Sequence, residues 1–117
     1  MKKIILRQGD IVYLDFSPSV DTEISGIRPA VVVSSDVYNY NSSYIMVVPV
    51  TSGGTDFGTY VDLRGYRNVH GRVNASQVHC FSTERVRSRE LDHLRVGDFN
   101  KIRQEINKIL GGNLIYW

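Results

Sequence analysis

The residues Asp10-Ile11-Val12-Tyr13-Leu14-Asp15-Phe16 give the clearest strand signal in this chain of 117 amino acids. Apolar side chains at the even positions from 12 to 16 alternate with Ile11, Tyr13 and Asp15. A period of two is typical of a β-strand that has one face more buried than the other. Ser17-Pro18-Ser19 follows, so we expect the strand to end near Phe16.

Shorter apolar runs predict further strands. Pro29 introduces a β-branched run over residues 30–35, which we expect to be buried on both faces. Between it and the first strand, the polar residues through Gly26 indicate an exposed loop. Residues 36–43 predict a single helical turn, and residues 44–50, 59–63, 72–74 and 77–81 predict more strands. Five to seven short strands at this spacing indicate a small β-barrel.

The C-terminal part changes period. Asp98 is a plausible N-cap, and Gly111-Gly112 supplies a helix stop. Leu114-Ile115-Tyr116-Trp117 is apolar, and we expect it to pack on the barrel or on a second subunit. The chain is therefore predicted to be one domain over residues 1–117, mainly β with a C-terminal α-helix. The apolar stripe of that helix has steps of three and four: Phe99, Ile102, Ile106, Ile109 and Leu110.

Composition excludes several classes of protein. With 42% hydrophobic and 22% charged residues, the chain is far from the disordered, collagenous and coiled-coil classes. A single cysteine, Cys80, cannot form an internal disulfide, and the apolar run at residues 4–6 is far shorter than a membrane span of about 20 residues. We expect a cytoplasmic protein without membrane contact. The spacing of His70, His79 and His93 puts no two on adjacent helical turns, so we expect no metal and no cofactor.

The net charge of +2 conceals an uneven distribution. Residues 64–89 contain six arginines, no lysine and one glutamate, a net charge of +5. Guanidinium groups pair with phosphate and stack on bases, and Tyr66 and Phe81 are available for stacking, so this window suits single-stranded RNA. An ordinary solvated surface is the competing interpretation. The arginines are Arg64, Arg67, Arg72, Arg85, Arg87 and Arg89.

Two further motifs put reactive side chains at the ends of predicted strands. In Glu23-Ile24-Ser25-Gly26-Ile27-Arg28-Pro29, a glycine and a proline bracket one arginine at the start of a buried strand. In Pro49-Val50-Thr51-Ser52-Gly53-Gly54, a hydroxyl follows another strand. Arg28 alone would more often be an ion-pair partner, and Thr51 a turn hydroxyl. Together they could converge on one pocket.

At these residues the sequence resembles the MazF/PemK family of toxin endoribonucleases from bacterial toxin–antitoxin systems. The resemblance covers nearly the whole chain and includes the first strand, the Glu23 to Val32 segment, Val48-Pro49-Val50-Thr51-Ser52, and Gly71-Arg72-Val73 followed by Gln77. The family often has Gln where this chain has Ile24 and Gly where it has Asp21. Some members carry an acidic residue where this chain has Ser76, so that acid–base role does not transfer.

The resemblance implies an SH3-like barrel, a homodimer, and metal-independent cleavage of single-stranded RNA such as mRNA at short motifs. It also implies a cognate antitoxin whose acidic, partly disordered tail occupies the RNA groove. Arg28 and Thr51 fall on the catalytic arginine and threonine of the family. Other chain positions are expected to bind RNA: Ser52, His70, Asn74, Gln77, Arg85 and Arg87.

RNA can be cleaved without a metal when the ribose 2′-OH attacks the adjacent phosphate. This reaction needs a base that accepts the 2′ proton, a cation that stabilises the negative phosphorane, and an acid that protonates the leaving 5′ oxygen. The guanidinium of Arg28 suits the phosphate oxygens. The general base is unresolved, and Glu23 and His79 are the candidates for acid–base roles. Two other functions stay open: a non-enzymatic toxin similar to the CcdB gyrase poisons, and a non-catalytic RNA-binding barrel.

Overall fold

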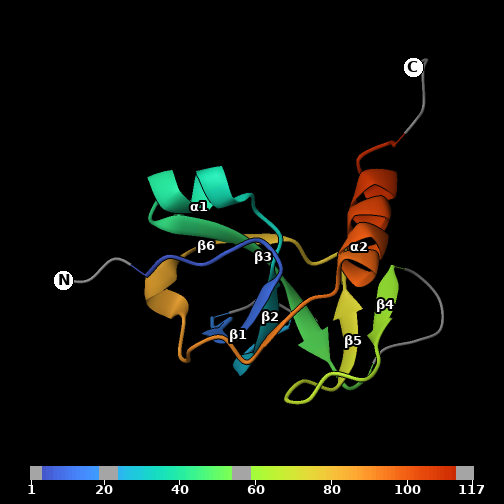
Figure 1. Cartoon of the computed structure of the whole chain (residues 1–117), viewed down its shortest axis with the longest axis horizontal. Helices are drawn as coiled ribbons and strands as arrows, with labels where there is room; N and C mark the ends of the chain where they lie inside the picture. Colours follow the sequence, from blue (N-terminus) through green and yellow to red (C-terminus); the bar gives the residue numbers. More distant parts are fainter. Residues whose placement is uncertain (1–3, 19–23, 54–58, 113–117) are drawn as a thin grey trace.

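The computed structural model describes residues 4–18, 24–53 and 59–112 (Figure 1). Within these ranges the chain forms a curled antiparallel sheet and two α-helices. The elements in chain order are β1 (Asp10–Asp15), β2 (Ile27–Val32), α1 (Asp36–Asn41), β3 (Tyr44–Thr51), β4 (Tyr60–Leu63), β5 (Gly71–Asn74), β6 (His79–Ser82), a 3₁₀ turn (Thr83–Arg85), β7 (Asp92–His93) and α2 (Val96–Ile109).

Strand β3 is the centre of the sheet. It pairs with β2 along one edge, while its other edge pairs with β6 in the first half of the strand and with β5 in the second half. Because β3 changes partner along its length, the sheet curls into a half-barrel. The strand order is β4-β5-β3-β2-β1-β7, with β6 joined to β3. The predicted fold class, mainly β with five to seven strands and a C-terminal helix, is confirmed.

The two faces of the sheet bury separate apolar clusters. Helix α2 packs on one face, where Ile102 joins a cluster that includes Val31 and Val48. The opposite face carries a second cluster that includes Val32 and Val47. Successive residues of β2 therefore point to different clusters, and the run over residues 30–32 is buried on both faces as predicted. Figure 1 shows α2 beside β4 and β5, and α1 at the other end of the molecule.

The prediction that Asp98 caps the helix is wrong. Helix α2 begins at Val96 with Arg95 as its N-cap, and Asp98 lies in the first turn. There its carboxylate accepts a hydrogen bond from the hydroxyl of Tyr66, with an O···O distance of 2.7 Å. Tyr66 is buried rather than available for stacking on a base, and Arg95 lies over its ring at 4.2 Å from the centroid. The tyrosine therefore fastens the helix start to the sheet.

The end of α2 departs from the predicted apolar stripe. Gly111 and Gly112 have positive φ and end the helix as expected. Ile102 is fully buried, but Ile109 and Leu110 are 50% and 74% exposed because the helix extends past the sheet. Residues 114–117, which we expected to pack on the barrel or a second subunit, lie outside the described residues. In the described ranges, no helix is long and apolar enough to cross a membrane.

Candidate active site

Arg28 and Thr51 lie on the face of the sheet opposite α2. The ladder between β2 and β3 pairs Ala30 with Pro49, and two residues further along each strand come Arg28 and Thr51. Side chains alternate between the two faces of a strand, so Arg28 and Thr51 point to the same face as Ala30. Ala30 belongs to the cluster on the face opposite α2. At this point β3 leaves β2 and pairs with β5. The two side chains predicted to be catalytic therefore flank the place where the sheet divides.

Close packing of β5 shapes the backbone at Thr51. Gly71 has φ of +123°, and a Cβ built on it would lie 2.4 Å from the carbonyl oxygen of Thr51. Only glycine allows this approach and this backbone conformation. The Thr51 hydroxyl accepts a hydrogen bond from the amide of Gly53 at 3.2 Å, which orients it toward the turn. Ser52 is exposed immediately after it.

Arg28 is half-buried, and its Nε donates a hydrogen bond to the carbonyl of Ser25 at 3.1 Å. Among the residues that the structure describes, it makes no ion pair with a carboxylate. Glu23, the acid–base candidate from the same segment, lies outside the described residues. The positive charge of Arg28 is therefore not neutralised by any described acidic side chain.

The side-chain oxygens of Gln77 and Asn74 both accept hydrogen bonds within the protein. The side-chain oxygen of Gln77 accepts a hydrogen bond from the amide of Ile24 at 3.0 Å, which ties the segment before β2 to the start of β6. Asn74 is buried, and its side-chain oxygen accepts hydrogen bonds from the amide and hydroxyl of Ser76. Both residues therefore stabilise loops around the site, and their contact with RNA stays a prediction.

His79 belongs to an aromatic cluster on the same face. Its ring stacks on Phe81 at 4.9 Å, and Phe16 meets both rings edge-on. Nδ1 lies 2.9 Å from the carbonyl oxygen of Gln77, and because a carbonyl only accepts, Nδ1 carries the proton and Nε2 is the acceptor in the neutral ring. His79 pairs with Val47, so it lies about 13 Å from Thr51 along β3 at about 3.3 Å per residue.

The arginine window divides between two regions of the fold. Arg85 lies over Phe81 at 4.3 Å and donates hydrogen bonds to the carbonyl groups of Asp15 and Ser17. Arg87 lies 3.8 Å from the carboxylate of Asp15. These contacts hold the end of β1 to the segment that contains Arg85 and Arg87. They do not prevent either arginine from binding RNA. The pKa of Asp15 is lowered, first by the hydrogen bond from the Ser17 amide and to a smaller extent by the positive charges of Arg87 and Arg85.

The other half of the window lies around the β4–β5 hairpin. Arg64 and Arg72 share the carboxylate of Asp62, with N···O distances of 3.3 and 3.2 Å. His70, predicted to bind RNA, is exposed in the connecting loop beside Gly71. Sequence reasoning did not identify Asp62, because only the strand register places it beside Arg72, which is itself the ladder partner of Thr51.

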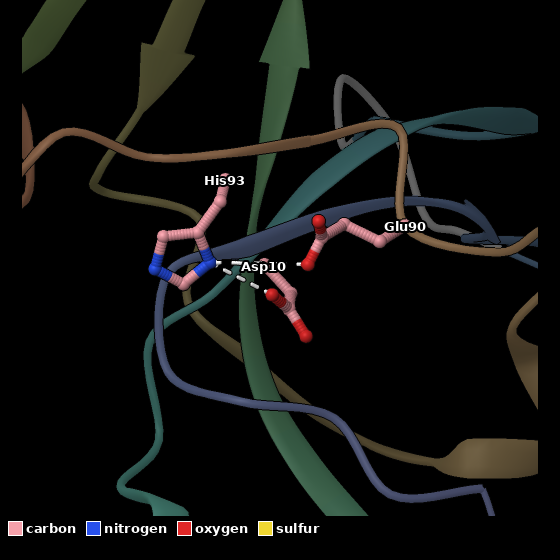
Figure 2. Close-up of side chains that lie close together, drawn as sticks. All are labelled: Asp10, Glu90 and His93. Atoms are coloured by element: carbon pink, nitrogen blue, oxygen red, sulfur yellow. Dashed lines mark hydrogen bonds and ion pairs between the residues drawn. The ribbon is translucent and has the colours of Figure 1, made fainter.

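A separate cluster lies at the far end of β1. The carboxylates of Asp10 and Glu90 and the ring of His93 come together there (Figure 2), with ligand-type atoms within 4.8 Å of one another. Spacing along the chain did not reveal it, because pairing of β1 with β7 brings the residues together. The Arg7 guanidinium lies 4.0 Å from Asp10 and 3.8 Å from Glu90, so a protein cation already faces these carboxylates. We interpret the cluster as a structural contact.

Known proteins resemble this chain over most of its length. The family model described as PemK-like, MazF-like toxin of type II toxin–antitoxin system matches residues 7–110. The endoribonuclease toxin MazF of Escherichia coli (strain K12) is 28% identical over 111 residues, which cover 95% of this chain and 99% of that protein. Endoribonuclease EndoA of Bacillus subtilis (strain 168) is 35% identical over 49 residues, which cover 42% of each chain.

Solved structures show the same fold. A crystal structure of MazF from Deinococcus radiodurans superposes with a TM-score of 0.85 at 27% identity, covering 92% of this chain and 98% of that one. A MazE–MazF complex from the same organism superposes with a TM-score of 0.78 at 24% identity, covering 94% and 99%. From its sequence and its fold, the chain belongs to the PemK-like, MazF-like family of toxins of type II toxin–antitoxin systems.

Proposed function

We propose that this protein is an endoribonuclease toxin that cleaves single-stranded RNA in the cytoplasm without a metal ion. The observation that carries the proposal is the placement of Arg28 and Thr51 at corresponding positions of β2 and β3, on the face that α2 leaves open. A guanidinium without a described carboxylate partner, on the same face of the sheet as a hydroxyl, suits a phosphodiester. The E. coli and B. subtilis relatives are named endoribonucleases, which supports the same activity here.

In the proposed reaction the ribose 2′-oxygen attacks the adjacent phosphorus. The O2′–P bond forms, the P–O5′ bond breaks, a base accepts the 2′ proton, and an acid protonates the leaving 5′ oxygen. The products are a 2′,3′-cyclic phosphate and a 5′-hydroxyl. Arg28 binds the non-bridging oxygens and stabilises the charge that develops on the phosphorane, and the Thr51 hydroxyl hydrogen-bonds the same phosphate. None of these steps requires a metal ion.

Glu23 and His79 are the proposed candidates for the proton transfers. Arg28 itself is a poor base, because the pKa of a guanidinium is above about 12. Glu23 precedes Arg28 in the same segment and is the first residue to test as the proton acceptor. His79 is the weaker candidate, because its separation of about 13 Å from Thr51 along β3 favours contact with a neighbouring nucleotide instead.

The RNA would cross the same face. The aromatic cluster of Phe81 and His79 can stack on unpaired bases, and Arg85 and Arg87 lie at its border. At the other end of the face, Ser52 and His70 are exposed beside Thr51 and Gly71. Asn74 and Gln77 would contribute by holding the loops that border this path.

We also propose two protein partners. The family and the MazE–MazF complex indicate a cognate antitoxin, whose acidic tail would compete with RNA for the arginines. A homodimer is supported by the apolar groove of about 470 Å³ along α2, which includes Val33, Met46, Ile106 and Leu110. Sedimentation of the pure protein at micromolar concentration should give twice the mass of the chain, and a monomer would contradict this part of the proposal.

The decisive experiment is incubation of the pure protein with single-stranded RNA in EDTA, followed by mapping of the ends. We expect cleavage with 5′-hydroxyl products, no cleavage where the attacking nucleotide carries 2′-deoxyribose, and a rate reduced about 100- to 1,000-fold in Arg28→Ala. RNA that stays intact at high protein concentration would overturn the proposal. Bound but uncleaved RNA would instead indicate a non-catalytic RNA-binding barrel, and neither binding nor cleavage would favour a CcdB-like toxin with a protein target.

A further inference from the structure

Thr51 has arginines on both sides along the sheet. On β2, Arg28 lies at the corresponding position past the last ladder pair. On β5, Arg72 is the direct antiparallel partner of Thr51. Partners in an antiparallel ladder project from the same face, so the side chains of Thr51 and Arg72 share the face opposite α2. The row continues to β4, where Asp62 is the partner of Arg72.

The guanidinium of Arg72 is held in place by its neighbours on β4. Its Nε lies 3.2 Å from a carboxylate oxygen of Asp62, and its central carbon lies 5.5 Å from the centre of the Tyr60 ring. The Arg72 side chain is 25% exposed, so it reaches the surface while most of its length is packed. An arginine constrained in this way loses little conformational entropy when it binds an anion.

A second guanidinium group, that of Arg64, lies close to Arg72. Asp62 also lies 3.3 Å from Arg64, so one carboxylate faces two guanidinium groups. A pocket of about 310 Å³ is lined by both arginines and by Ser52. Because Ser52 follows Thr51 directly, the guanidinium groups that line this pocket lie near the hydroxyl proposed to contact the phosphate. This arrangement suits a phosphate group.

We propose that Arg72 is a second phosphate-binding arginine, which contacts the scissile phosphate from the side of Thr51 opposite to Arg28, and that Asp62 positions it. The inference rests on the proposed ribonuclease function. Attack by the 2′-oxygen adds negative charge to the non-bridging oxygens, and two guanidinium groups on either side stabilise that charge better than one. Arg72 would therefore act mainly on the rate of cleavage and less on the affinity for RNA.

The test uses a short oligonucleotide spanning one mapped cleavage site, and the same oligonucleotide with 2′-deoxyribose at the attacking nucleotide. We expect Arg72→Ala to lower kcat about 100-fold, while KM and the Kd of the uncleavable oligonucleotide change less than about three-fold. Arg72→Lys should recover only part of the rate, because lysine lacks the planar fork. Asp62→Asn should lower kcat less than Arg72→Ala does, with binding unchanged.

Arg103→Ala is the matched control, because Arg103 also lies over an aromatic ring, that of Phe99 at 5.2 Å, but on the helix face. Its kcat should equal that of the wild type. If Arg72→Ala cleaves like the wild type while Arg28→Ala does not, this inference is overturned and the ribonuclease function stands. A change confined to KM would also overturn it, because it would indicate a flanking phosphate. If Arg72→Ala does not fold, as judged by its melting curve, Arg72→Lys decides by the same criteria.

Discussion

His93 lies across the β1–β7 ladder from Asp10, and its Nδ1 is 2.8 Å from Oδ1 of that buried carboxylate. Burial raises the pKa of Asp10, but hydrogen bonds from Glu90, the Arg7 amide and His93 outweigh it and hold this pKa below 3.8. Its partner Glu90 has a raised pKa, first because of the hydrogen bond to Asp10 and then because of burial and repulsion by Asp10. The pKa values of these two neighbouring carboxylates are therefore shifted in opposite directions.

We predict that Glu90→Gln stabilises the protein slightly at pH 7. A raised folded-state pKa means that the ionised form of Glu90 disfavours folding above that pKa, and glutamine keeps a hydrogen-bond donor without the charge. The gain should be at most about 1 kcal/mol, because the side chain is 42% exposed and solvent screens the repulsion. Urea unfolding at pH 7 and pH 4 measures it, and the difference should shrink at pH 4, where Glu90 becomes protonated.

Asp10→Asn is the contrasting variant. Because the folded-state pKa of Asp10 is lowered, its ionised form stabilises the fold above pH 3.8, and this contribution disappears as the pH falls through the lower folded-state value. The loss at pH 7 should be about 1–3 kcal/mol, as expected for a buried, charged acceptor that loses its charge. An unfolding free energy equal to that of the wild type at pH 7 would show that the Asp10 hydrogen bonds contribute nothing.

Gly71→Ala should both destabilise the protein and slow cleavage. The new Cβ would lie 2.4 Å from the Thr51 carbonyl oxygen at a φ of +123°, so either β5 or the end of β3 must shift. The backbone conformation alone costs about 1–3 kcal/mol for a residue other than glycine. Gly97→Ala in α2 is the control, since nothing lies within 4 Å of its added Cβ, and it should gain up to about 1 kcal/mol. Thermal melting and the cleavage rate should separate the two variants.

Local patterns were sufficient to predict most of the fold. The alternation over residues 10–16 corresponds to β1, and the β-branched run after Pro29 corresponds to the buried part of β2. The helix start was misassigned because Asp98 is a good N-cap type, whereas its carboxylate is used by the hydroxyl of Tyr66, 32 residues earlier in the chain. Such a contact depends on tertiary structure and leaves no periodic signal.

The site was predictable only where residues are close in sequence or share a family motif. Arg28 and Thr51 come from such motifs, but the loop-holding role of Gln77 comes from a contact with Ile24, 53 residues earlier in the chain. The Asp62–Arg72 pair and the Asp10–Glu90–His93 cluster depend on strand register. Register is set by the whole sheet, so spacing along the chain cannot reveal it.

Tyr66→Phe should weaken the attachment of α2 to the sheet. The hydroxyl donates to Asp98 and accepts from the Arg95 amide at 2.8 Å, so its removal leaves both without that partner in a partly buried place. We expect a loss of about 1–3 kcal/mol in the free energy of unfolding. Tyr44→Phe is the control, because Tyr44 is 50% exposed, and it should change stability by less than about 0.5 kcal/mol. Equal unfolding curves for the two variants would contradict this assignment.

Substitutions of His79 distinguish stacking from proton transfer. Its ring is stacked on Phe81 at 4.9 Å, and the register separates it from Thr51 by about 13 Å along β3. We therefore predict that His79→Phe keeps kcat within about three-fold of the wild type, while His79→Ala weakens binding of uncleavable RNA by about 1–3 kcal/mol. The measurements are single-turnover rates and Kd values from pH 5 to 8. A loss of kcat in both variants, together with loss of one limb of the pH profile, would instead assign His79 the acid–base role, because phenylalanine can stack but cannot carry a proton.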